Sequence, residues 1–198
     1  GLLLSQTSQV LAGDIISVNY AWITQLGLNL SFRLDGLSYL FSLLILGIGL
    51  LVILYARYYL SEQERVARFF SCLLLFMGSM LGLVLAGNLL LMLMFWELTS
   101  LSSFLLIGFW SHQTAARQGA RMALAVTGGG GLALLAGILV IGHVVGSYEL
   151  TEVLAAGDVL RAHGLYPVAL VLVLLGVFTK SAQFPFHFWL PHAMSAPT

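Results

Sequence analysis

Two ionisable side chains, Glu97 and Lys180, lie inside apolar stretches of the sequence, where a charge is costly. Glu97 occurs in "MFWELTSLSSFLLIGFW", residues 94–110, and its nearest charged neighbours are Arg68 and Arg117. The other seven acidic and seven basic residues fall in connections or at the ends of apolar runs. A charge at the centre of a bilayer costs at least about 2.5–3.5 kcal/mol, so two such residues of opposite sign suggest that they form a pair.

The residues around Glu97 suit a carboxylate in an apolar setting. Ser100 and Ser103 follow Glu97 at three-residue steps, and Thr99 lies beside them. On a helix this spacing gives one polar strip that can hydrate the carboxylate or donate hydrogen bonds to it. The alternative is that the hydroxyls only aid helix packing or bond to their own backbone.

Lys180 precedes a predicted helix break in "FTKSAQFPFHFWLPHAM", residues 178–194. Pro185 has no N–H and crowds the preceding turn, so the helix cannot continue regularly. Such breaks occur at membrane depth only inside protein or against water, and they are typical of ion sites in transporters. If the helix resumes, Gln183 and His187 follow Lys180 on nearly one face, which makes His187 a further candidate for the ion path. The alternative is a lysine that extends to the membrane edge.

The composition places the chain in a membrane. Of 198 residues, 60% are hydrophobic and 8% are charged, and the mean hydropathy is +0.99; soluble domains carry roughly 25% charged residues. Five uncharged runs reach or exceed the roughly 18 residues of a membrane span, and these are 36–56, 69–96, 98–116, 122–148 and 162–179. The formal net charge is zero and no basic stretch occurs, so nothing in the sequence indicates nucleic acid or anionic lipid headgroups as partners.

These runs predict an all-α bundle of about five spans that ends in a broken helix. The run 69–110 is too long for one helix, and we expect two helices joined at Gly87-Asn88. Strict alternation in 15–34 predicts a β-hairpin at the membrane surface, and 149–162 is typical of a short amphipathic helix. The fifth span is expected over 165–184, and the glycines of "TGGGG" at 127–131 indicate close helix packing rather than a phosphate loop.

The arginines predict the orientation of the bundle. Alternating spans place five arginines at one end and two at the other, and the positive-inside rule makes the first end cytoplasmic. Residues 1–34 and 143–164 are then external. We expect one membrane domain over 1–198, incomplete at both ends, with an external hairpin region in 1–34 and the helical bundle in 35–198.

Three segments resemble the antiporter-like subunits shared by Mrp-type cation/proton antiporters and respiratory complex I. They are "FWELTSLSSFLLIGFW", "GARMALAVTGGGGLALLAG" and "FTKSAQFPFHFWLPHAMSAPT", and "LGLNLSFRLDGLSYLF" agrees with them. The resemblance is strongest to the large A subunit of Mrp antiporters and covers nearly the whole chain. It implies part of a bundle of about fourteen helices with two inverted repeats, each containing a broken helix. It also implies that Glu97 is the family's glutamate of the fifth helix and that Lys180 is its lysine of the broken seventh helix.

By this resemblance the chain is expected to be an ion-translocating subunit that exchanges H⁺ for Na⁺, a secondary transporter rather than an enzyme. We expect it in the cell (inner) membrane, surrounded by lipid and by other subunits of a hetero-oligomeric complex, with no cofactor and no bound metal. A charge pair at about 4 Å attracts by roughly 4 kcal/mol at an effective dielectric constant near 20. Two alternatives stay open: a proton-pumping subunit of NADH:quinone oxidoreductase or of a membrane-bound hydrogenase, and an inert membrane scaffold.

Overall fold

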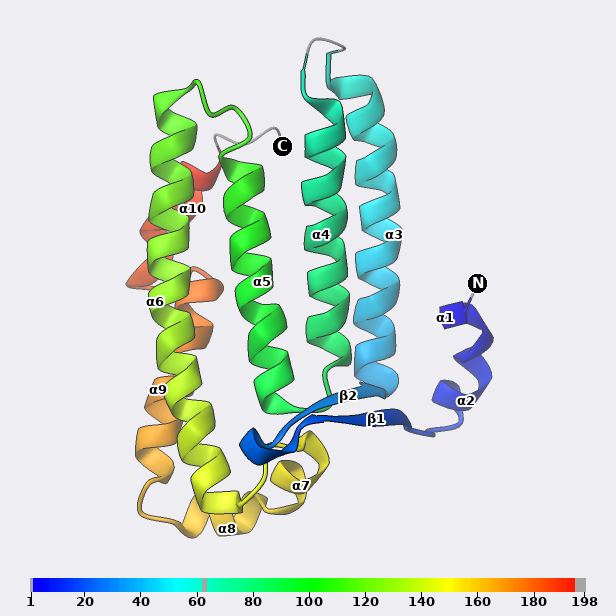
Figure 1. The fold of residues 1–198 in the computed structure, drawn as a ribbon, viewed down its shortest axis with the longest axis vertical. Coiled ribbons are helices and arrows are strands. Elements are labelled where there is room, and N and C mark those ends of the chain that lie inside the picture. Colours follow the sequence, from blue (N-terminus) through cyan, green and yellow to red (C-terminus); the bar gives the residue numbers. More distant parts are fainter. Residues whose placement is uncertain (1, 62–63, 195–198) are drawn as a thin grey trace.

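The bundle is built from four long helices that stand side by side in the computed structural model, which describes residues 2–61 and 64–194 (Figure 1). Within these residues, the four helices that are long and apolar enough to cross a membrane are α3 (Gly36–Tyr59), α4 (Val66–Leu85), α5 (Leu89–Ile107) and α6 (Thr114–Val145). Two short helices, α1 (Leu2–Ser5) and α2 (Thr7–Leu11), lie beside the start of α3. The chain is a multi-pass membrane protein, as its composition predicted.

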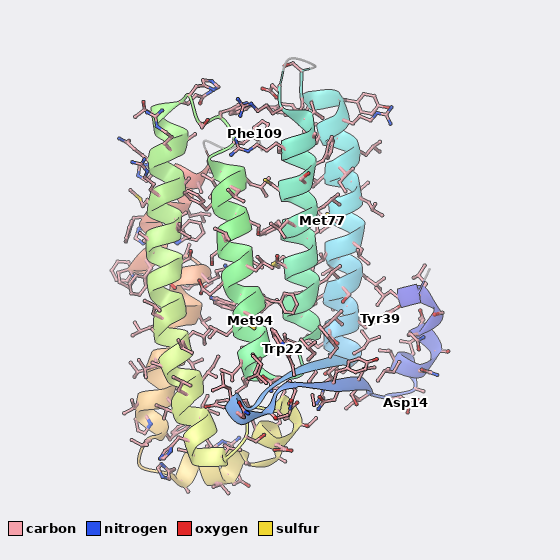
Figure 2. All side chains as sticks on the ribbon, viewed as in Figure 1. Asp14, Trp22, Tyr39, Met77, Met94 and Phe109 are labelled. Carbon is pink, nitrogen blue, oxygen red and sulfur yellow. The ribbon has the colours of Figure 1, made fainter. Side chains whose placement is uncertain are left out.

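The predicted hairpin is confirmed at one end of the bundle. Strands β1 (Ile16–Ile23) and β2 (Leu28–Leu34) pair antiparallel, connected by the 3₁₀ turn η1 (Thr24–Leu26) and by Gly27 at φ +67°, a conformation that favours glycine. The helices α7 (Leu150–Ala155) and α8 (Gly157–Ala162) lie at the same end, where one amphipathic helix was expected. Figure 2 shows Trp22 of the hairpin at this end and Phe109 at the opposite end.

A buried asparagine ties the hairpin to the bundle. The predicted break at Gly87-Asn88 is confirmed, because α4 ends at Leu85 and α5 begins at Leu89. The Asn88 side chain accepts hydrogen bonds from the first turn of α5 and donates to the Gly27 carbonyl and to Glu149 Oε1, both at 2.9 Å. Asn29 Nδ2 donates to the same Glu149 oxygen. The hairpin, the α4–α5 turn and the segment after α6 are therefore fixed to one another.

The start of α3 is a capping box. Asp35 Oδ1 accepts the Ser38 N–H at 3.0 Å, and Ser38 Oγ accepts the Asp35 N–H at 2.7 Å, which satisfies two N–H groups that the helix leaves free. Partial burial raises the pKa of the Asp35 carboxyl, but the hydrogen bonds from Ser38 and from Arg33, with its positive charge, outweigh that effect and hold the pKa below its ordinary value. Asp35 is thus the N-terminal cap of α3.

Glycines let α6 and α9 (Tyr166–Lys180) approach closely. A Cβ added to Gly130 would meet the side chain of Thr179, and one added to Gly176 would lie 2.7 Å from Leu134 Cβ. By contrast, Gly128 and Gly129 face open space. The interpretation of the glycine run as close helix packing is confirmed for Gly130, which faces α9.

The fifth helix was predicted over 165–184, and it is shorter than that in the structure. Helix α9 ends at Lys180 after 15 residues, a rise of about 22 Å, whereas the hydrocarbon core is about 30 Å thick. The chain then turns through Ala182, at φ +50°, into the 3₁₀ turn η2 (Phe186–Phe188) and the short helix α10 (Trp189–Ala193). The broken helix is confirmed, but the first half ends before the proline.

Candidate functional site

Glu97 and Lys180 lie near the middle of the bundle, held by three helices. Glu97 is the ninth of the nineteen residues of α5, and Lys180 is the last residue of α9. Both helices pack against the central glycines of the 32-residue α6, where Gly131 faces Glu97. The two candidate residues, 83 positions apart in the sequence, are therefore brought to the same depth of the bundle.

The Lys180 ammonium is bound by three oxygen atoms of α5. Lys180 Nζ donates to Ser100 Oγ at 2.6 Å, to Thr99 Oγ1 at 2.7 Å and to the Trp96 carbonyl at 3.2 Å. It also lies 5.5 Å from the centre of the Trp96 ring, within the range of a cation–π contact. An ammonium group has three N–H donors, so all of them have acceptors in this cradle. The lysine does not extend to the membrane edge, because its head group is bound inside the protein.

Glu97 does not form a direct ion pair with Lys180. In the described part of the chain, the ion pairs within 4.0 Å are Arg33–Asp35 and Arg161–Asp158. Glu97 Oε1 is buried and has no hydrogen-bond partner among the described residues. A buried carboxylate oxygen without a donor is costly, and a proton, a cation or a water molecule would satisfy it.

The predicted serine strip serves the lysine rather than the glutamate. Ser100 accepts its hydrogen bond from Lys180, and its own hydroxyl lies 3.3 Å from the Trp96 carbonyl. Thr99 donates to that carbonyl at 2.7 Å and accepts from Lys180. Thr99 and Ser100 thus bond to the backbone of their own helix, as the alternative interpretation expected, and they also accept hydrogen bonds from Lys180.

A cavity of about 200 Å³ adjoins the Lys180 head group, with room for several water molecules. Four hydroxyl groups line it together with the ammonium, and the full lining is Phe76, Met80, Thr99, Ser100, Ser103, Ala123, Thr127, Lys180 and Trp189. The ammonium and the four hydroxyl groups can bind water in this mainly apolar cavity, so water there would accept a proton that leaves Lys180.

The turn after α9 places Trp189 in the lining of this cavity. Trp189, in α10, donates its indole N–H to the Thr179 carbonyl at 2.9 Å, a carbonyl near the end of α9, where helical N–H donors run out. The Gln183 N–H, which a continuing helix would give to Thr179, bonds to Phe178 instead. The end of α9 and the position of Trp189 are thereby coupled.

His187 and Gln183 do not share a face with Lys180, contrary to the expectation. Both are exposed, and the His187 ring stacks on Phe184 with the ring centres 5.8 Å apart. The reason is the turn at Ala182, which changes the direction of the chain before the proline. Conversely, no pattern in the sequence indicated that Trp189 or Gly131 would contact the site.

Residues 86–198 match the family described as "NADH:quinone oxidoreductase/Mrp antiporter, TM", and residues 22–70 match the N-terminal region described for chain 5 of NADH-ubiquinone oxidoreductase (complex I). The first match covers more than half of the chain. The chain belongs to the NADH:quinone oxidoreductase/Mrp antiporter family. The resemblance noted in the sequence is confirmed.

Relatives within this family are antiporter proteins by name. The chain is 61% identical over 189 residues to the A/B subunit of a probable K(+)/H(+) antiporter of Rhizobium meliloti (strain 1021), covering 96% of this chain and 19% of the relative. It is 49% identical over 195 residues to the A1 subunit of a Na(+)/H(+) antiporter of Staphylococcus haemolyticus (strain JCSC1435), covering 98% of this chain and 24% of the relative. The chain thus spans about a fifth to a quarter of the length of these relatives.

A solved Mrp structure has the same arrangement of helices. The structure of the Mrp complex from Dietzia sp. DQ12-45-1b matches with a TM-score of 0.88 and 36% sequence identity. The match covers 99% of this chain and 21% of the chain in that complex. Both the sequence and the fold of this family member are therefore similar to the Mrp antiporter proteins.

Proposed function

We propose that the chain forms part of a subunit that exchanges protons for a monovalent cation, and that Lys180 and Glu97 carry the exchange. The observation that supports this most directly is the Lys180 ammonium, bound by three oxygens of α5, together with the half-buried Glu97, whose Oε1 atom is buried without a hydrogen-bond partner among the described residues. The similar proteins are named as subunits of K⁺/H⁺ and Na⁺/H⁺ antiporters. An inert scaffold would have no need for two opposite charges in its centre.

In the proposed mechanism, Lys180 holds the proton and the Glu97 carboxylate sets the field around it. Because the two groups are more than 4.0 Å apart, their attraction is below roughly 4 kcal/mol at an effective dielectric constant near 20. A proton or a cation that binds at Glu97 cancels this attraction. Lys180 then releases its proton into the adjoining cavity, and departure of the cation from Glu97 favours its return.

The site thereby couples two ions without direct contact between their binding groups. The cradle of Thr99, Ser100 and the Trp96 carbonyl accepts hydrogen bonds but carries no formal charge. It can hold either the ammonium or the neutral amine of Lys180, so the charge of Glu97 decides between them. Na⁺ or K⁺ could supply the positive charge, and the other subunits of a membrane complex would complete the path.

The test is cation-driven proton exchange in inverted membrane vesicles that contain the complete complex, measured with a pH-sensitive dye after addition of NaCl or KCl. Glu97→Gln and Lys180→Ala should each abolish exchange, while Ser181→Ala, at the exposed neighbour of Lys180, should leave it unchanged. The protein composition of the purified complex controls for assembly. Exchange near the wild-type rate in either site variant, with normal assembly, would refute the proposal.

A further inference from the structure

Three arginines from two helices meet at the end of the bundle opposite the hairpin. Arg68 lies in the first turn of α4, and Arg117 and Arg121 lie in the first two turns of α6. All three line one hollow of about 210 Å³ beside the end of α5. Arg117 and Arg121 are about one helical turn apart in α6, and the packing of α4 against α5 and of α5 against α6 adds Arg68 to them.

The three guanidinium groups are not neutralised by partners in the described part of the chain. The ion pairs found there involve other residues, Arg33–Asp35 and Arg161–Asp158. Arg117 is oriented by hydrogen bonds to the Ser111 carbonyl, at 2.9 Å, and to Thr114 Oγ1, at 3.3 Å, both neutral acceptors. These contacts fix the position of the Arg117 group without cancelling its charge.

A described carboxylate that shares a hollow with Arg68 has another partner for one of its oxygens. Glu64 lines the adjoining hollow, which it shares with Arg68, and its Oε1 accepts the indole N–H of Trp110 at 2.8 Å. It forms no ion pair with an arginine among the described residues. An excess of positive charge therefore remains around the hollow that Arg68, Arg117 and Arg121 line.

We propose that this hollow binds the phosphate of an anionic phospholipid. Its polar rim consists of the three arginines and Ser111, and its remaining lining is apolar: Phe104, Leu105, Gly108 and Ala120. Guanidinium groups bind phosphate oxygens in a bidentate manner, and basic pockets between membrane helices at the cytoplasmic side are suited to anionic headgroups. A free phosphate ion would use the arginines only, whereas a lipid would also contact the apolar side chains of Phe104 and Leu105 at the end of α5.

The orientation predicted from the arginines, these three among them, places the hollow at the cytoplasmic side. The arginine-rich end is the end that the positive-inside rule makes cytoplasmic, and the cytoplasmic leaflet carries the anionic lipids. The residues that line the hollow belong to the end of α5 and to the first turns of α4 and α6, at the end of the bundle opposite the hairpin.

The test is titration of the complete purified complex in detergent with a short-chain phosphatidylglycerol, with phosphatidylcholine of the same chain length, and with inorganic phosphate, followed by native mass spectrometry. The site variants are Arg68→Gln and Arg121→Gln, both exposed residues with no hydrogen bond among the described residues that substitution would break. The matched control is Arg57→Gln, which removes the same charge from the same end but lines none of the hollows described here.

We expect phosphatidylglycerol to bind in preference to phosphatidylcholine. Each site variant should weaken its binding about fivefold and the double variant about thirtyfold, the equivalent of about 1 kcal/mol per arginine. Arg57→Gln should change the affinity less than about twofold. Equal loss in Arg57→Gln would overturn the proposal in favour of a general surface charge. Inorganic phosphate that competes at the same concentration as the lipid would overturn the lipid assignment, and release of a partner protein from the double variant would identify an acidic protein segment instead.

Discussion

Gly131 offers a way to move the Glu97 carboxylate without altering its chemistry. A Cβ added at this position would overlap Glu97 Oε1 and would lie 2.7 Å from Glu97 Cδ. Ordinary contacts between heavy atoms are roughly 3.5–4.0 Å, so in Gly131→Ala the carboxylate must retreat by about 1 Å. Because this group is the far end of a flexible side chain, we expect the helix to fold normally while the carboxylate changes position.

The size of the effect follows from two limits. For two unit charges, an increase in separation from about 5 to about 6 Å, taken as an example, weakens the attraction by about 0.5 kcal/mol, a factor of about two, at an effective dielectric constant near 20. A reacting group misplaced by 1 Å can cost about a hundredfold. We therefore expect Gly131→Ala to lower the rate of proton exchange about tenfold in the vesicle assay.

The neighbouring glycines supply the matched control. Gly128 and Gly129 lie in the same helix and face open space, so Gly128→Ala adds the same methyl group without touching the site. Exchange by this variant should equal the wild-type rate, and the amount of assembled complex should be the same for both alanine variants. Equal losses of exchange from Gly131→Ala and Gly128→Ala would mean that the glycines act only through helix packing.

A double variant tests whether the effect passes through Glu97. Glu97→Asp shortens the side chain by one C–C bond, about 1.5 Å, and so makes room for the alanine methyl group at position 131. The two substitutions should not be additive: Gly131→Ala should cost much less in the Glu97→Asp background than in the wild type. Additive losses would refute the reasoning, because they would show that the methyl group disturbs something other than the carboxylate.

Two further predictions concern tryptophans outside the charge pair, and a third concerns the cap of α3. Trp189→Phe keeps the aromatic ring but removes the hydrogen bond to the Thr179 carbonyl, so we expect about 1 kcal/mol of lost stability together with slower exchange. Trp110→Phe removes a similar bond at the end of the bundle, and it should lower the melting temperature in detergent without slowing exchange. The Asp35 carboxylate stabilises the fold above its unfolded-state pKa, near 3.9, because its folded-state pKa is lowered. The difference in melting temperature between the wild type and Asp35→Asn should therefore be present at pH 6 and vanish as the pH falls through the folded-state pKa; a difference independent of pH would contradict this assignment.

Much of the fold could be predicted from the sequence, because the features that specify it are local. The length of an uncharged run fixes how far a helix extends through a bilayer, and strict alternation specified the hairpin of β1 and β2. Asn88, a side chain that caps a helix, marks the division of the run 69–110 into two helices. Glu97 and Lys180 could be selected as candidates for the same reason, since each is a charge within an apolar run.

The tertiary structure decided what these two residues contact. Rotation of α5 about its axis directs Thr99 and Ser100 to Lys180 and leaves Glu97 opposite Gly131. Hydropathy carries no information about this rotation, because every side of such a helix is apolar or weakly polar. The expectation for His187 failed for a related reason: it required a continuous helix, and the turn at Ala182 removes that continuity.

The hollow that Arg68, Arg117 and Arg121 line shows most clearly that the sequence does not indicate which residues share a site. Arg68 and Arg121 are 53 positions apart, and as single charges at helix ends they indicated only the orientation of the chain. Packing of the helices brings them to one hollow. The sequence by itself determined four of the five expected spans and which charges are confined within the bundle, because both depend on the transfer of short segments from water, whereas the extent of α9 was not predicted. Which side chains share a site was decided only by the tertiary structure, because it depends on the rotation and depth of helices that meet after they have formed.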